Sequence, residues 1–152
     1  MRPPFIFLFM KSYYPDSCIY LNLWKKEVDE FGNLLWKFAK DFFEKAEGEG
    51  SIIHYSGFLL KELMFILSTE EYLQKRELFE SSLNFQKVIL SKEEYNLANK
   101  IREDANNEIS FFDAIHMLLA KKTNSILVTR DRLLIKAAKK NFVLVRRPEE
   151  IL

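Results

Sequence analysis

The sequence predicts an α/β protein in which helices connect the strands of a mostly parallel sheet of four or five strands. Short runs rich in β-branched and aromatic residues alternate with one or two longer segments of helical periodicity. Four Gly and four Pro leave little room for long loops. The length of 152 residues suits a single domain, residues 1–152, with its own apolar core. Strands separated by helices in this way indicate right-handed crossovers.

The expected strands are short, and each ends at a turn or at the start of a helix. They cover residues 12–15, 51–55, 86–90, 126–128 and 142–145. Pro15 cannot donate a ladder hydrogen bond, so the first strand ends there at the latest. The apolar run at residues 5–10 is too short to span a membrane and has no small-residue cleavage site. We therefore expect no membrane association, and residues 1–9 are interpreted as an extension.

Helices are expected wherever apolar residues recur at helical spacing. They cover residues 19–24, 31–47, 58–67, 70–83, 92–105, 111–122 and 132–140. The start signals are Thr69 as a cap, Ser91 with Glu94 as a capping box, and Ser110 with Asp113 as a similar pair. The glycines at 48 and 50 end the second helix.

Composition and charge indicate a cellular location but allow two interpretations each of the basic segment and of the aromatic content. The single cysteine, Cys18, excludes an intrachain disulfide and favours a reducing, cytoplasmic location. Residues 121–147 contain nine Lys or Arg against Asp131 alone, a net charge of +8. Such a segment either contacts nucleic acid or forms a solvated helix face. Aromatic residues make up 14% of the chain and predict a bulky core or an apolar association surface.

Four acidic residues stand out by their position. Asp16 and Asp131 each follow a strand and precede a helix, and Asp113 lies in the first turn of a helix. Helix capping alone explains each of these three. Glu62 lies on a helix that is apolar nearly all round, where an ion pair with Lys or Arg is the structural alternative. If all four converge at the carboxyl edge of the sheet, a divalent cation is needed to keep them ionised.

Four local motifs in chain order resemble the PIN-domain nucleases, especially the VapC-like toxins of type II toxin–antitoxin pairs. The motifs are Pro-Asp-Ser-Cys-Ile-Tyr-Leu at 15–21, Tyr-Ser-Gly-Phe-Leu-Leu-Lys-Glu-Leu at 55–63, residues 113–120, and Leu-Val-Thr-Arg-Asp at 127–131. The resemblance spans about residues 12–147. It implies a three-layer α/β/α fold and divalent-metal-dependent hydrolysis of RNA phosphodiester bonds. It also implies an antitoxin partner and a homodimer.

The resemblance assigns roles to particular residues. Asp16, Glu62, Asp113 and Asp131 would be the catalytic acids and would bind Mg²⁺ or Mn²⁺ through hard oxygen ligands. Ser17 and Thr129 would support the site by positioning water or phosphate, unless they are ordinary turn and cap residues. Arg130, Arg132 and Lys136 would contact the RNA backbone. For the homodimer we expect burial of the large apolar residues of the early helices, namely Leu23, Trp24, Leu35, Trp36, Phe38, Phe42 and Phe43.

Two positions depart from the family pattern. Pro15 replaces the usual aliphatic residue before the first acid, and His116 lies where the family more often has a small or aliphatic residue. We interpret His116 as a polar residue on a partly exposed helix edge; a role near the substrate is the alternative. Cys18 is interpreted as a core residue because no His is near it in the sequence.

Other functions compete with a toxin ribonuclease. One is a catalytically inactive PIN-like module that binds RNA or protein, although acids at all four motif positions argue against it. Another is a PIN nuclease of RNA processing that has no antitoxin. A receiver-like signalling domain would show paired acids after the first strand and a lysine after the last. Neither feature is present, since Pro15 precedes Asp16 and two arginines follow Val145.

Overall fold

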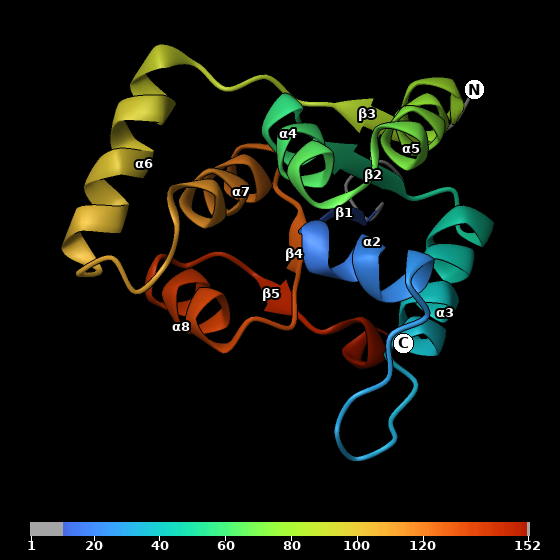
Figure 1. The fold of residues 1–152 in the computed structure, drawn as a ribbon. Helices are drawn as coiled ribbons and strands as arrows, with labels where there is room; N and C mark the ends of the chain where they lie inside the picture. Colours follow the sequence, from blue (N-terminus) through green and yellow to red (C-terminus); the bar gives the residue numbers. More distant parts are fainter. Residues whose placement is uncertain (1–10, 152) are drawn as a thin grey trace, which may run out of the picture.

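The computed structural model describes residues 11–151, so the expected extension at residues 1–9 lies outside the described part of the chain. A five-stranded sheet of order β3-β2-β1-β4-β5 runs through the centre of the fold, and all of its paired strands are parallel (Figure 1). The strands are β1 (Ser12–Pro15), β2 (Ile52–Tyr55), β3 (Phe85–Lys87), β4 (Ile126–Val128) and β5 (Val145–Arg146). The expected parallel sheet is confirmed, and β1 occupies its central position.

Helices cover both faces of this sheet (Figure 1). They are α2 (Ser17–Trp24), α3 (Leu35–Gly48), α4 (Gly57–Ile66), α5 (Thr69–Ser81), α6 (Lys92–Asp104), α7 (Phe111–Lys122) and α8 (Arg132–Lys140), with a 3₁₀ turn η1 (Pro148–Glu150). The helix α3 packs on β2 and η1, whereas α7 packs on β1 and β4 and is flanked by α4, α6 and α8. The three-layer α/β/α arrangement that the resemblance implied is therefore present.

Two consecutive tyrosines in β1 show how the two faces are filled. Neighbouring strand residues point to opposite faces of a sheet. Tyr13 packs edge-on against Phe42 of α3, with ring centroids 5.1 Å apart. Tyr14 lies in the other core cluster, with Ile115 and Leu119 of α7. Both tyrosines are almost completely buried. The central strand thus anchors both apolar layers.

Several predicted boundaries were wrong at the ends of elements. The second helix begins at Leu35 rather than at residue 31, because Asp29 accepts hydrogen bonds from the amides of Phe31 and Asn33 and closes a loop there. The last strand starts at Val145 rather than 142. Ahead of it, Phe142 has φ of 60°, which is incompatible with a strand. Ser68, not Thr69, caps α5, and the third strand covers Phe85–Lys87 instead of 86–90.

The early aromatic residues are largely used inside the fold. Phe42 is buried, and Trp24 and Phe43 both pack against the buried ring of Tyr20. Large exposed apolar side chains include Phe31, which precedes α3 and is 82% exposed, and Phe65 near the end of α4, which is 68% exposed. In residues 11–151, no helix combines the length and the apolar character required to cross a membrane.

Candidate active site

Asp16 lies at the junction of β1 and α2, where the chain leaves the centre of the sheet. Its backbone amide donates to the carbonyl of Val128 at 3.0 Å, which extends the pairing with β4 just past Pro15. One carboxylate oxygen accepts from the Cys18 amide at 3.1 Å and from the Cys18 thiol at 2.7 Å. The other oxygen accepts from the Thr129 hydroxyl. Asp16 therefore caps α2, which is the structural role that the sequence suggested for it. It is also held by the Thr129 hydroxyl, just after β4.

Burial shapes the electrostatics of this acid. Removal from water raises the pKa of Asp16 to about 6; the nearby charge of Asp113 acts in the same direction, and the hydrogen bonds from Cys18 and Thr129 oppose it. Burial also raises the pKa of the Cys18 thiol well above its ordinary value, and the neighbouring Asp16 adds to this shift. Cys18 is thus a neutral donor to Asp16, which agrees with its interpretation as a packing residue rather than a nucleophile.

Thr129 links two of the acids. Its hydroxyl donates to Asp16 and accepts from the backbone amide of Asp131 at 3.1 Å, and the residue is completely buried. The hydroxyl therefore bridges the Asp16 carboxylate and the backbone amide of Asp131. Ser17, the first residue of α2, is partly exposed, and its supporting role stays a prediction.

Asp113 and Asp131 are held by the helices that they begin. Asp113 and Ser110 form a capping box: Ser110 Oγ accepts from the Asp113 amide at 3.0 Å, and an Asp113 oxygen accepts from the Ser110 amide at 3.4 Å. Asp131 caps α8, with one oxygen accepting from the amides of Leu133 and Leu134 at 2.9 and 3.1 Å. The expected capping function is present at both positions.

Glu62 and His116 form a pair that the sequence reasoning missed. His116 Nε2 contacts Glu62 Oε1, and His116 Nδ1 lies 2.8 Å from the Tyr14 hydroxyl. The interpretation of His116 as a residue on a partly exposed edge was wrong, because its side chain has no solvent exposure. The partner of Glu62 is this histidine, not a Lys or Arg. Polar residues at Tyr14, Ser56 and His116 in otherwise apolar segments were the available signal.

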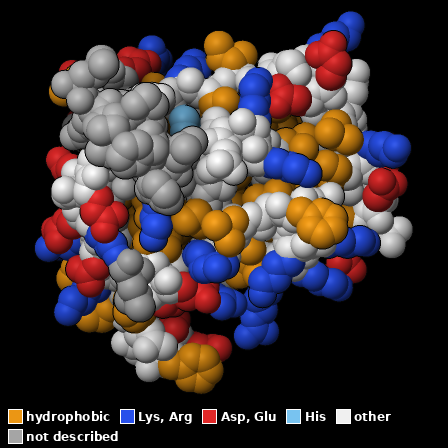
Figure 2. All heavy atoms as spheres, turned by 180° about the vertical axis from the view of Figure 1, so that it is seen from behind, with side chains coloured by type: hydrophobic (Ala, Val, Ile, Leu, Met, Phe, Trp, Pro, Cys, Tyr) orange, Lys and Arg blue, Asp and Glu red, His pale blue; other side chains and the backbone are white. Residues whose placement is uncertain are grey.

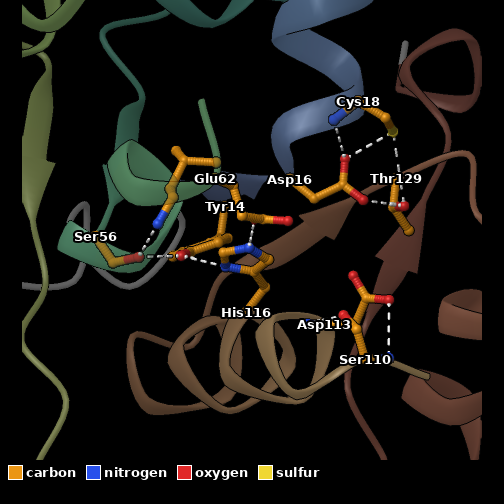
Figure 3. A network of polar contacts seen from close by, with 10 residues as sticks. Tyr14, Asp16, Cys18, Ser56, Glu62, Ser110, Asp113, His116 and Thr129 are labelled. Carbon is orange, nitrogen blue, oxygen red and sulfur yellow. Dashed lines mark hydrogen bonds and ion pairs between the residues drawn. The ribbon is translucent and has the colours of Figure 1, made fainter. Parts of the chain in front are cut away.

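Asp16, Glu62 and Asp113 lie near one another in Figure 3, and Asp131 is connected to Asp16 through Thr129. The pKa of Asp113 is raised, first by burial and then by the charges of Asp131 and Glu62, and the charge of Asp113 in turn acts on Asp16. Within residues 11–151, one carboxylate oxygen each of Glu62, Asp113 and Asp131 has no hydrogen-bond partner. These are hard oxygen donors of the kind that Mg²⁺ and Mn²⁺ prefer, and a cation would relieve their mutual repulsion.

The donor chemistry therefore fits a divalent cation. In the described part of the chain, no three His, Cys, Asp or Glu side chains are already arranged to hold a metal ion. Convergence of the four acids on one common point stays a prediction. Glu62 and Asp113 lie on the same side of the sheet, because Glu62 contacts His116 one turn along α7 from Asp113.

The basic segment is divided between two edges of the molecule. Arg132 begins α8 beside the acids, whereas Lys139 and Lys140 end it about 13 Å away. Lys121 and Lys122 likewise end α7, far from Asp113 at its start. Lys and Arg side chains gather over the α8 side of the face seen in Figure 2, which is the reverse of the view in Figure 1. Only part of the +8 charge lies near the acids.

The three residues expected to contact RNA differ in their availability. Arg130 forms an ion pair with Glu149 at 2.9 Å, donates to Asn22 at 3.0 Å and lies over the ring of Phe38. Its guanidinium is therefore occupied within the fold. Arg132 and Lys136 are exposed, and for these two the RNA contact stays a prediction.

Comparisons with known proteins agree with this architecture. The structure is similar to VapBC2 from Rickettsia felis, solved with a promoter DNA fragment, with a TM-score of 0.63 and 17% identity over 89% of this chain and 97% of the other. It is also similar to FitAcB from Neisseria gonorrhoeae, with a TM-score of 0.59 and 16% identity over 90% and 97% of the two chains. No curated protein sequence matches the chain. The PIN domain family model matches residues 13–140, so the chain belongs to the PIN domain family, whose members are generally nucleases that use divalent metals.

Proposed function

We propose that this protein is a divalent-metal-dependent endoribonuclease that hydrolyses RNA phosphodiester bonds. The observation that carries the proposal is the set of three unpartnered carboxylate oxygens, on Glu62, Asp113 and Asp131, around the buried Asp16. The pKa of Asp113 is raised by burial and by the charges of Asp131 and Glu62, which disfavours an empty site with Asp113 ionised. Membership of a nuclease family supports phosphodiester hydrolysis as the reaction.

Each acid has a distinct part in this proposal. Asp16, Glu62, Asp113 and Asp131 would hold Mg²⁺ or Mn²⁺. Glu62, Asp113 and Asp131 each have a free oxygen for this, whereas both oxygens of Asp16 also accept hydrogen bonds. When bound, the metal would supply an activated water and neutralise charge on the phosphate. Thr129 keeps Asp16 and the start of α8 together, so two of the acids move as one unit. Arg132 and Lys136 would contact the RNA backbone.

We also propose that the protein is the toxin of a type II toxin–antitoxin pair. The motif resemblance to VapC-like toxins supports this, together with the similar fold of VapBC2. A short upstream reading frame with a DNA-binding pattern, whose product co-purifies with this chain, is the expected observation. Specific RNA cleavage with no such neighbour would favour a nuclease of RNA processing.

A homodimer is proposed on a revised surface. Among the described residues, Met64, Phe65 and Ile66 at the end of α4 are exposed, whereas the early-helix aromatics are buried (Phe42) or partly buried. Exposed apolar residues of this size favour association between copies. Sedimentation should give about twice the chain mass of 18.1 kDa, and Phe65→Glu should reduce it to the monomer. A wild-type protein that remains monomeric at high concentration would contradict the dimer.

The test of the nuclease is the Asp113→Asn variant assayed on single-stranded RNA with Mg²⁺ and with Mn²⁺. Asn preserves the size and the capping ability of Asp, so the fold should persist. Loss of one ionised ligand should remove about 3 kcal/mol of transition-state stabilisation, a decrease of roughly 100-fold in cleavage rate. Asp41→Asn on the exposed surface of α3 is the matched control and should cleave normally.

Two outcomes would contradict the proposal in different ways. A folded Asp113→Asn protein that cleaves at the wild-type rate would leave capping as the only role of Asp113. Wild-type protein that binds several RNAs but cleaves none of them with either metal would favour a binding module. RNA binding, unlike the chemical step, should weaken strongly with added salt, because the contacts are made with phosphates.

A further inference from the structure

A chain of hydrogen bonds connects the interior of the protein to Glu62. It starts at Ser56, which caps α4, passes through the Tyr14 hydroxyl of β1 and His116 of α7, and ends at the Glu62 carboxylate (Figure 3). Ser56 Oγ lies 2.7 Å from the Tyr14 oxygen, which lies 2.8 Å from His116 Nδ1. Tyr14 and His116 have no exposure to solvent and Ser56 has 1%. The four residues of this hydrogen-bond network come from three separate segments of the polypeptide.

The available hydrogens allow only one order of donors and acceptors along this network, from Ser56 to Glu62. Ser56 Oγ accepts from the Leu59 amide at 3.1 Å, so its own hydrogen is free to donate to Tyr14. Burial raises the pKa of Tyr14 far above its ordinary value, so the phenol keeps its hydrogen and donates it to His116 Nδ1. His116 Nδ1 then accepts this hydrogen, and Nε2 carries the hydrogen that points at Glu62. The reverse order would place the Nε2 lone pair against an ionised carboxylate.

This direction has a consequence for the acid at the end of the chain. A glutamate side chain has three rotatable bonds, and the Glu62 side chain is 19% exposed. The bond from His116 engages Oε1, so Oε2 remains available toward the other acids. The charge of Glu62 acts on Asp113, which agrees with a carboxylate that faces the site.

We propose that Tyr14 and His116 are positioning residues that hold Glu62 ready to bind a divalent cation through its free oxygen. The inference rests on the proposed metal-dependent function. It adds two residues, Tyr14 and His116, that are neither acids of the motifs nor helix caps. Residues that orient a metal ligand through hydrogen bonds typically change metal affinity or activity by 10–100-fold when they are removed.

The decisive variant is Tyr14→Phe, which deletes one oxygen atom and preserves the ring. Tyr13→Phe is its matched control, because Tyr13 is the adjacent buried tyrosine and packs on the opposite face of the sheet. We expect Tyr14→Phe to weaken Mn²⁺ binding about 10-fold by calorimetry and Tyr13→Phe to leave it unchanged. Cleavage by Tyr14→Phe should recover toward the wild-type rate when Mn²⁺ is saturating, because the role of Tyr14 acts through affinity.

A second pair of variants separates positioning from folding. His116→Gln can still donate a hydrogen bond to Glu62 from its amide, whereas His116→Leu cannot. Gln should therefore preserve more of the Mn²⁺ affinity than Leu, although both replace a buried histidine. If both variants lose stability equally and bind Mn²⁺ as tightly as the wild type, the chain is structural only and the inference is wrong.

A third measurement needs no metal and no change to the residues that it tests. Nitrogen-15 NMR of the metal-free wild type should show a hydrogen on His116 Nε2, directed at Glu62. The protein has two histidines, so His54→Gln identifies the signals. A ring whose only hydrogen lies on Nδ1 would overturn the inference. Wild-type protein that binds no Mn²⁺ would instead reject the proposed function, and the role of these residues in metal binding with it.

Discussion

The four acids of the site are held in two different ways. Asp113 and Asp131 are held by backbone amides at the starts of their own helices, within three residues of themselves. Asp16 and Glu62 also depend on side chains that are distant in sequence, Thr129 for the one and His116 for the other. The first pair is built by local chain geometry, whereas the second exists only when β1, β4, α4 and α7 are assembled. Substitutions should separate these two kinds of support.

The largest effect on stability is expected for Asp16→Asn in metal-free protein. The pKa of Asp16 is raised from 3.8 to about 6, so between these values the folded state binds a proton that the unfolded state has released. The wild-type free energy of unfolding should therefore fall as pH rises through this window, by up to about 3 kcal/mol, and stay low above it. Asp16→Asn should flatten this decrease and be more stable than the wild type at pH 8.

Urea unfolding with EDTA at several pH values measures this effect. Asp41→Asn, an exposed change on α3, is the control and should follow the wild-type curve. The raised pKa of Asp113 acts in the same direction and should leave a smaller residual slope in Asp16→Asn. An Asp16→Asn protein less stable than the wild type at pH 8 would show that the bonds to Cys18 and Thr129 outweigh the burial of charge.

An intermediate effect is expected for Thr129→Val, which has nearly the same shape but no hydroxyl. The change leaves one oxygen of the buried Asp16 without its donor and the Asp131 amide without its acceptor. A hydrogen bond to a charged group contributes about 1.5–3 kcal/mol, so we expect a loss of about 2 kcal/mol in urea unfolding at neutral pH. Thr123→Val is the control, because its hydroxyl bonds lie at the far end of α7. Equal losses in both variants would remove the distinction between distant and local support.

The smallest effect is expected for Ser110→Ala, which removes the cap of α7. Loss of a helix cap typically destabilises a protein by about 1 kcal/mol. Ser91→Ala removes the equivalent capping box of α6, away from the acids, and should be equally destabilising. Only Ser110→Ala should alter the stabilisation by Mn²⁺ in thermal unfolding, because the hydroxyl of Ser110 accepts from the amide of Asp113, whereas that of Ser91 accepts from the amide of Glu94. Identical Mn²⁺ responses would show that the cap and the metal use Asp113 independently.

The same difference between local and distant support explains which features could be predicted from the sequence. Strand β4 and helix α8 were predicted at their observed bounds, because compact apolar runs between polar caps are local signals. Asp16, Asp113 and Asp131 were singled out from junction patterns of the same kind, and Glu62 from its position on a helix that is apolar nearly all round. The buried environment of His116 was missed, because one polar residue in an apolar helix does not reveal a partner 54 residues away. The Arg130–Glu149 ion pair was missed for the same reason, although both residues flank regular elements.

The central position of β1 has a consequence for the time at which the protein can become active. Asp16 and Thr129 are separated by 113 residues. At a synthesis rate of about 5–20 residues per second, roughly 6 to 23 seconds pass between their incorporation. Until β4 pairs with it, one side of β1 is open and Asp16 lacks its donor from Thr129. A growing chain therefore contains the first acid long before Asp16 gains its donor, so the arrangement of the acids is completed only when most of the polypeptide has been made.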